Sequence, residues 1–143
     1  MLPRIIPVLV AIIALLVTSS VPALAQTSAR DVGQKASETI EAIKNYTVEK
    51  KDEAVAHSKK VIADADGKIK DLEKQAAKQT GEAKAKSQAL IKDLKAKRTK
   101  ASQKASELGK ATKASWDKAK DGFAEAYRDL ATAYDKALGE FKK

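Results

Sequence analysis

The chain contains no cysteine among its 143 residues and only one histidine, His57. The lack of cysteine excludes disulfides and the lipid-attachment residue of a bacterial lipoprotein. A zinc site would need most of its ligands from carboxylates, so we expect His57 on a solvated helix face. No Gly-rich phosphate loop, GxSxG or HExxH motif is present. The sequence therefore predicts a non-enzymatic protein with no catalytic, cofactor-binding or metal-binding residue.

Proline is absent after Pro22, and no run of alternating apolar and polar residues long enough for a strand is present. The rest of the chain is dominated by Ala, Lys, Glu, Asp and Gln, which are strong helix formers or common on helix surfaces. Acidic and basic residues recur at helical spacing, for example Asp93 with Lys97 and Glu107 with Lys110. These features predict an all-α protein.

Large apolar side chains are also scarce. Beyond residue 25 the chain has 23 alanines and only 21 larger apolar or aromatic residues. A compact domain of this length usually has more. We therefore expect no sizeable globular core, and elongated amphipathic helices that are partly disordered in isolation.

The N-terminal segment has the pattern of a secretory signal peptide. Arg4 precedes an apolar run of 13 residues, and the small residues at Ala23 and Ala25 match a cleavage site. We expect residues 1–25 to be removed after Ala25, which makes the protein periplasmic or secreted. A retained membrane anchor is the alternative, although the apolar run is shorter than the roughly 20 residues of a spanning helix.

An eleven-residue period runs through the remaining chain. Every position in this row is apolar: Val61, Leu72, Ala83, Leu94, Ala105, Trp116, Tyr127 and Leu138. Eleven residues in three turns match the free helix closely, so the row stays on one face. We predict two or three long helices or a coiled-coil hairpin, with breaks at residues 64–67 and 109–115, where Asp or Gly favours a turn.

Charge divides residues 26–143, which we interpret as one elongated helical region, into three zones. Residues 26–73 are nearly balanced, residues 74–113 carry twelve basic and three acidic side chains, and residues 114–143 are neutral. The middle zone holds the candidate residues for binding polyanions: Lys84, Lys86, Lys92, Lys95, Lys97, Arg98, Lys100 and Lys104. Such density attracts anionic membrane surfaces or nucleic acid with low specificity. A merely solvated helix face is the alternative.

The last zone concentrates aromatic and large apolar residues at helical intervals. These candidates for helix packing or an interface are: Trp116, Phe123, Tyr127, Leu130, Tyr134, Leu138 and Phe141. A seam against another helix is the first interpretation, within the chain or by self-association. A membrane-interface face is the alternative, because Trp and Tyr suit the head-group boundary. No small-molecule substrate is expected.

Two stretches resemble known helical proteins. The segment KQAAKQTGEAK, residues 74–84, resembles the eleven-residue motif of group 3 late embryogenesis abundant proteins, and EAKAKSQALIKDLKAK continues in the same manner. The tail ASWDKAKDGFAEAYRDLATAYDKALGEF is similar to the ends of small bacterial coiled-coil stress-response proteins. The resemblance implies protection against dehydration, osmotic or envelope stress by a chain that becomes more helical as water is withdrawn, and the signal-peptide pattern adds export. An apolipoprotein-like helix that binds anionic lipid and a structural coiled-coil subunit remain the alternatives.

Overall fold

The computed structural model describes residues 34–141, and this part of the chain is helical with no strand. A first helix covers residues 34–45, and a short 3-10 helix, η1, covers Val48–Lys50. Three long helices follow: α2 (Lys51–Ala77), α3 (Gly81–Lys110) and α4 (Trp116–Phe141). The all-α prediction is confirmed. The expected signal peptide and its cleavage site lie outside the described residues.

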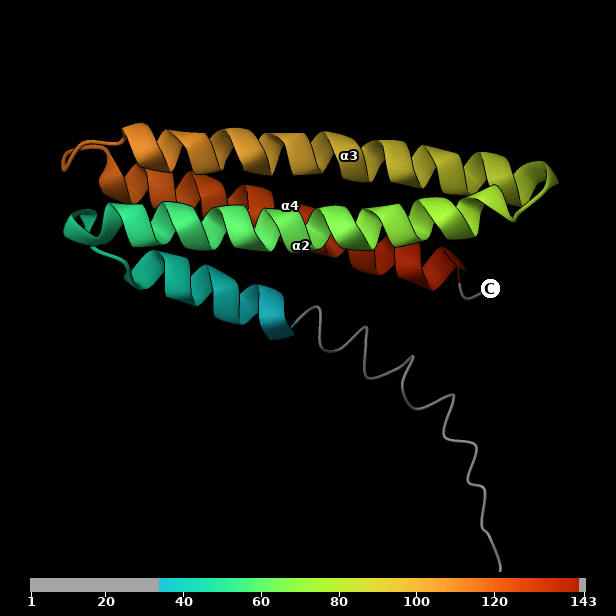
Figure 1. Cartoon of the computed structure of the whole chain (residues 1–143), viewed down its shortest axis with the longest axis horizontal. Helices are drawn as coiled ribbons and strands as arrows, with labels where there is room; N and C mark the ends of the chain where they lie inside the picture. The colour runs from blue at the N-terminus through green and yellow to red at the C-terminus, as the bar shows by residue number, and fades with distance from the viewer. Residues whose placement is uncertain (1–33, 142–143) are drawn as a thin grey trace, which may run out of the picture.

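The three long helices form an elongated antiparallel bundle (Figure 1). Helix α3 packs against both α2 and α4, and the first helix runs back beside α2. Each long helix spans most of the length of the bundle, and short turns connect successive helices at alternate ends. The arrangement agrees with the prediction of two or three long helices and adds one shorter helix.

The turn between α2 and α3 lies at residues 78–80, a position that the sequence did not predict. Gly81 begins α3 with φ of +61°, a conformation in which a side chain would be strained. The Ser87 hydroxyl donates a hydrogen bond to the side chain of Gln79, which ties the turn to α3. The stretch KQAAKQTGEAK therefore contains the reversal of the chain.

The first predicted break is wrong, since residues 64–67 lie within α2. A glycine in a helix costs only about 1 kcal/mol relative to alanine, and the buried Ile62 and Ile69 on either side hold the helix in the bundle. The second predicted break is confirmed, because α3 ends at Lys110 and α4 begins at Trp116. The Ser115 hydroxyl accepts a hydrogen bond from the amide of Thr112 at 3.0 Å within this turn.

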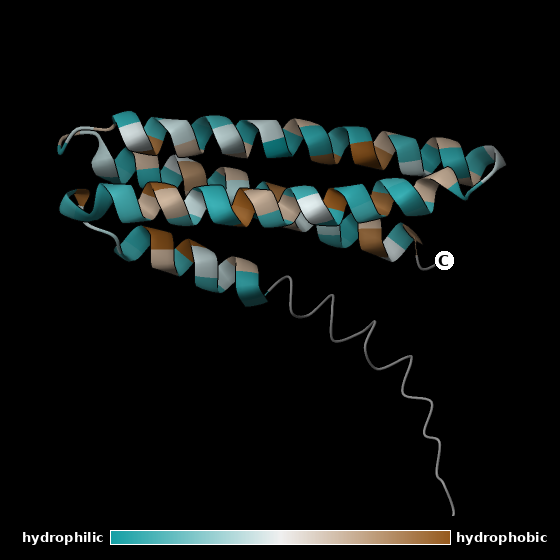
Figure 2. Ribbon diagram, in the orientation of Figure 1, coloured by the Kyte–Doolittle hydropathy of each residue, from teal (hydrophilic) through white to brown (hydrophobic). Residues whose placement is uncertain are grey.

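A continuous apolar core runs along the bundle, contrary to the expectation that no sizeable core forms. The structure buries 20 apolar side chains, nine of them alanine. The brown apolar residues in Figure 2 alternate with teal polar residues along each helix. Small side chains let helices approach closely, so a core can form with few large residues. Of the eleven-residue row, Leu72, Leu94, Ala105 and Trp116 are buried, whereas Ala83 in the first turn of α3 is exposed.

Candidate functional site

All eight candidate polyanion-binding residues lie on α3. This helix carries nine basic and three acidic side chains, whereas α4 carries four basic and six acidic ones. Five of the candidates are exposed, and Lys97, Arg98 and Lys104 are half-buried. The bundle therefore places its most basic helix beside one with an acidic excess.

Some of these cations hold the helices together. Arg98 donates from Nε and Nη2 to the two carboxylate oxygens of Asp66 on α2, at 2.6 and 2.7 Å. This hydrogen bond to Asp66 raises the pKa of Arg98. Lys95 forms an ion pair with Glu73 on α2. Arg98 and Lys95 thus have structural partners within the chain, while their role in polyanion binding stays a prediction.

Lys86 extends the same pattern towards α4, where its Nζ lies 2.5 Å from Oε2 of Glu140. Two more cations pair within α3. Lys97 lies 3.9 Å from Asp93, as the spacing predicted, and Lys104 pairs with Glu107 at 3.0 Å. The sequence spacing predicted a pair between Glu107 and Lys110, but Glu107 pairs with Lys104 in the preceding turn of the helix.

Three of the candidate lysines remain exposed and form no ion pair within residues 34–141: Lys84, Lys92 and Lys100. Lys84 and Lys92 border a groove of about 510 Å³ between α2 and α3, together with Lys95. Gln88 and Ile91 also line it. This groove carries more positive than negative charge, since Glu73 is its one acidic residue.

The C-terminal aromatic residues lie against the core of the same chain. Trp116, Phe123 and Leu130 are buried, and the remaining members of the set are partly buried against the same cluster: Tyr127, Tyr134, Leu138 and Phe141. The rings of Phe123 and Tyr127 stack with centroids 5.9 Å apart. In this arrangement the predicted seam packs against helices of its own chain.

The sequence predicted His57 on a solvated helix face, but His57 does not lie on a fully solvated face. It is half-buried, its Nδ1 lies 3.4 Å from the Tyr46 hydroxyl, and the two rings meet edge to face. Tyr46 lies in the turn between the first helix and α2, eleven residues before His57. No local pattern around His57 could therefore indicate this contact. Among the described residues, no group of His, Asp and Glu could hold a metal ion.

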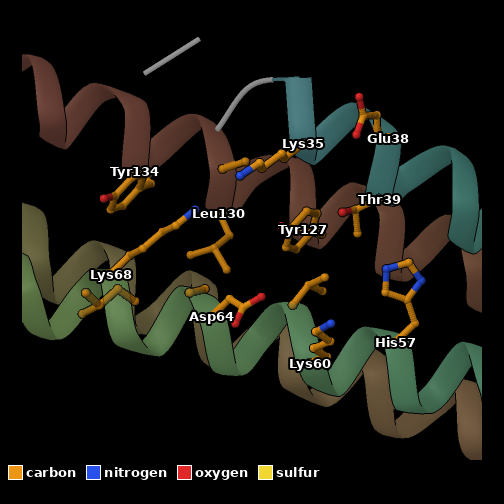
Figure 3. Close-up of a pocket in the computed structure, with 14 residues that line it drawn as sticks. Lys35, Glu38, Thr39, His57, Lys60, Asp64, Lys68, Tyr127, Leu130 and Tyr134 are labelled. Carbon is orange, nitrogen blue, oxygen red and sulfur yellow. The ribbon is translucent and has the colours of Figure 1, made fainter. Parts of the chain in front are cut away.

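A cavity of about 280 Å³ lies between the first helix, α2 and α4 (Figure 3). The sequence analysis did not identify it, although Tyr127, Leu130 and Tyr134 from its aromatic set line one wall. Burial raises the pKa of Tyr127, with the Thr39 side chain opposing the shift and the charge of Asp64 adding to it. Burial also raises the pKa of Tyr134. Both phenols are therefore neutral at physiological pH.

Comparison with known proteins found no matching family model, no similar curated protein and no similar solved structure. Within residues 34–141, no helix is both long and apolar enough to span a membrane.

Proposed function

We propose that this protein is an exported, non-enzymatic helical protectant that coats anionic surfaces of the cell envelope under dehydration or osmotic stress. The observation that carries the proposal is the set of exposed lysines without ion-pair partners on α3, which includes Lys84, Lys92 and Lys100. The resemblance to late embryogenesis abundant proteins supports the stress context, and the predicted signal peptide supports the location.

The charge distribution favours a surface as the partner. Ion pairs to Asp66, Glu73 and Glu140 occupy cations of α3 that face the neighbouring helices, while the exposed lysines are distributed over several turns. Lysine is a flexible, strongly hydrated point charge and suits phosphate groups at variable positions. Each basic residue near an anionic membrane contributes about 1 kcal/mol at physiological salt.

The elongated bundle suits this role because its long side can lie along a surface with several turns of α3 in contact at once (Figure 1). Such binding is weak at each point and has little specificity, which fits a coat better than a receptor. A structural coiled-coil subunit is less well supported, since the aromatic face packs within the chain.

Binding to vesicles tests the proposal. The variant K84Q/K92Q/K100Q removes three charges while keeping good helix formers. Its partitioning onto vesicles with anionic lipid should fall by on the order of 100-fold, the equivalent of about 1 kcal/mol for each lysine. The matched control K70Q/K118Q/K136Q removes three exposed lysines from α2 and α4 and should lose much less.

Protection is measured separately by drying dye-loaded anionic vesicles with the protein and recording leakage after rehydration. The parent and the control variant should retain the dye, and the α3 variant should retain less. Equal partitioning of the two triple variants would show that α3 has no special role. Leakage that is unchanged by the parent protein would contradict the protectant function itself.

A further inference from the structure

The cavity between the first helix, α2 and α4 combines an apolar wall with a polar rim. Its apolar lining comes from α2 and α4: Val61, Ala65, Ile69, Leu130 and Ala131. The rings of Tyr127 and Tyr134 extend this wall (Figure 3). Ligand sites in proteins typically have this composition, apolar over most of the surface with a few polar groups.

The rim of the cavity carries an excess of positive charge. Three lysines line it, Lys35, Lys60 and Lys68, against two acids, Glu38 and Asp64. None of the three lysines forms an ion pair within the described part of the chain. Each ammonium group thus keeps hydrogen-bond donors for a ligand.

The charges are not spread evenly around the opening. Figure 3 shows the side chains of Lys35, from the first helix, and Lys68, from α2, reaching towards Leu130. The Nζ of Lys68 lies 5.6 Å from the ring centroid of Tyr134. Asp64 adds to the raised pKa of Tyr127, and Asp71 and Asp135 add to that of Tyr134. Among the residues that line the cavity, the two lysines Lys35 and Lys68 therefore gather at the end that Tyr134 borders, with Asp135 beyond the lining as a neighbouring charge of Lys68.

We propose that this cavity binds a small amphiphile with one negative charge, a medium-chain carboxylate, with its alkyl chain on the apolar wall and its carboxylate between Lys35 and Lys68. A volume of about 280 Å³ holds roughly nine groups of the size of water, at about 30 Å³ each. Octanoate, with its eight carbons, matches that size. The sequence predicted no small-molecule substrate, and a bound ligand of this kind was not among its expected partners.

The inference is independent of the surface-coating function, which depends on α3, a helix that contributes no residue to this cavity. The neutral phenols of Tyr127 and Tyr134 add to the site, since a protonated hydroxyl can donate a hydrogen bond to a carboxylate.

Titration calorimetry with octanoate and with octanol distinguishes the contribution of the lysines from that of the apolar wall. We expect octanoate to bind the cavity with a dissociation constant of about 0.1–1 mM, as is usual for a ligand of this size. The variant K35Q/K68Q should weaken octanoate binding at least about fivefold and leave octanol binding unchanged, because only the carboxylate meets the two ammonium groups. The matched control K59Q/K70Q removes exposed α2 lysines outside the cavity and should behave as the parent.

A second variant tests the apolar wall. A65L adds volume inside the cavity and should weaken both ligands, provided that circular dichroism shows an intact helical bundle; A131L serves the same purpose if A65L unfolds. Octanoate could instead bind the lysines of α3, in which case K84Q/K92Q/K100Q would weaken it and K35Q/K68Q would not. That result, or no octanoate binding up to several times the expected dissociation constant, would overturn the proposal.

Discussion

The indole Nε1 of Trp116 donates a hydrogen bond to the backbone carbonyl oxygen of Tyr46 across 2.9 Å, joining positions 70 residues apart. Two lysines make similar bonds at this end of the bundle. Lys51 donates to the carbonyl of Ala111 at 3.0 Å, and Lys120 donates to the carbonyl of Lys44 at 2.7 Å. Side chains thus satisfy carbonyl groups at helix ends and connect the first helix to the start of α4.

Trp116 is only 4% exposed and is the one tryptophan, so its fluorescence reports on this packing. We expect emission that is shifted to the blue in buffer without any lipid and moves to the red in urea, together with the loss of helical circular dichroism. Emission like that of free indole in buffer, shifting to the blue only with vesicles, would contradict intrachain packing and favour the membrane-interface alternative.

Phe123→Ala should destabilise the bundle strongly, because Phe123 is fully buried and stacks on Tyr127. Removing a buried phenylalanine costs about 3–5 kcal/mol, a large fraction of the stability of a typical domain. Urea unfolding followed by circular dichroism measures the loss. Gly139→Ala is the control on the same helix, since Gly139 is exposed with open space around it, and it should stabilise by up to about 1 kcal/mol. Equal stability of the two variants would mean that Phe123 is not packed in a core.

The bidentate contact between Arg98 and Asp66 should contribute a measurable coupling energy. Both side chains are about one-third exposed, so solvent screening limits the coupling to about 1 kcal/mol. A double-mutant cycle with R98Q and D66N measures it, and R98K should fail to restore it because lysine lacks the planar fork. The pair Asp93–Lys97 lies within one helix at the longer distance of 3.9 Å; it is the comparison and should couple by less than about 0.5 kcal/mol. A coupling for Arg98 no larger than for Lys97 would show that α2 and α3 do not meet as described.

Asp135→Asn should stabilise the protein at neutral pH. The Oδ1 atom of Asp135 is buried without a hydrogen-bond partner, and burial raises the pKa of this carboxyl, with the charge of Lys68 opposing the shift. A raised folded-state pKa means that the charged form disfavours folding. The stabilising effect of the neutral form is complete below the unfolded-state pKa of 3.8 and is lost as the pH rises through the folded-state pKa.

The amide stays neutral, so we expect the melting temperature of D135N to exceed that of the parent by about 2–4 °C at pH 7, a figure that allows for solvent screening. The difference should disappear below about pH 3.8. Asp129→Asn, at an exposed position of α4, controls for the loss of a charge on the same helix. A gain that is equal in both variants, or that persists at pH 3, would contradict the burial of Asp135 as the cause.

The sequence predicted the features of the fold that depend on local composition and spacing. Alanine and lysine content predicted helices, and the interval from Trp116 to Phe141 predicted one packed face. The prediction of a break at residues 64–67 was wrong. The local preference of Asp and Gly for a turn is a small free energy, and the packing of Ile62 and Ile69 outweighs it. The core was underestimated because a count of large side chains ignores how closely alanine lets helices approach.

The candidate site depended more on contacts that no local pattern contains. Arg98 reads as one more free cation in its stretch of sequence, yet its partner Asp66 lies 32 residues away on another helix. The cavity needs three helices, and Lys35 and Lys68 both line it only because the first helix runs back along α2. The signal peptide and the location of the protein stay predictions from the sequence.

The short turns of the bundle have a consequence for how the chain folds. Helix α3 packs on the helices that directly precede and follow it, and the bundle also joins distant positions such as Tyr46 and Trp116. Helical bundles make many of their contacts within single helices and fold in microseconds to milliseconds, far faster than proteins that must pair distant strands. Under the proposed function, a chain unfolded at a drying surface would regain its helical bundle soon after water returns.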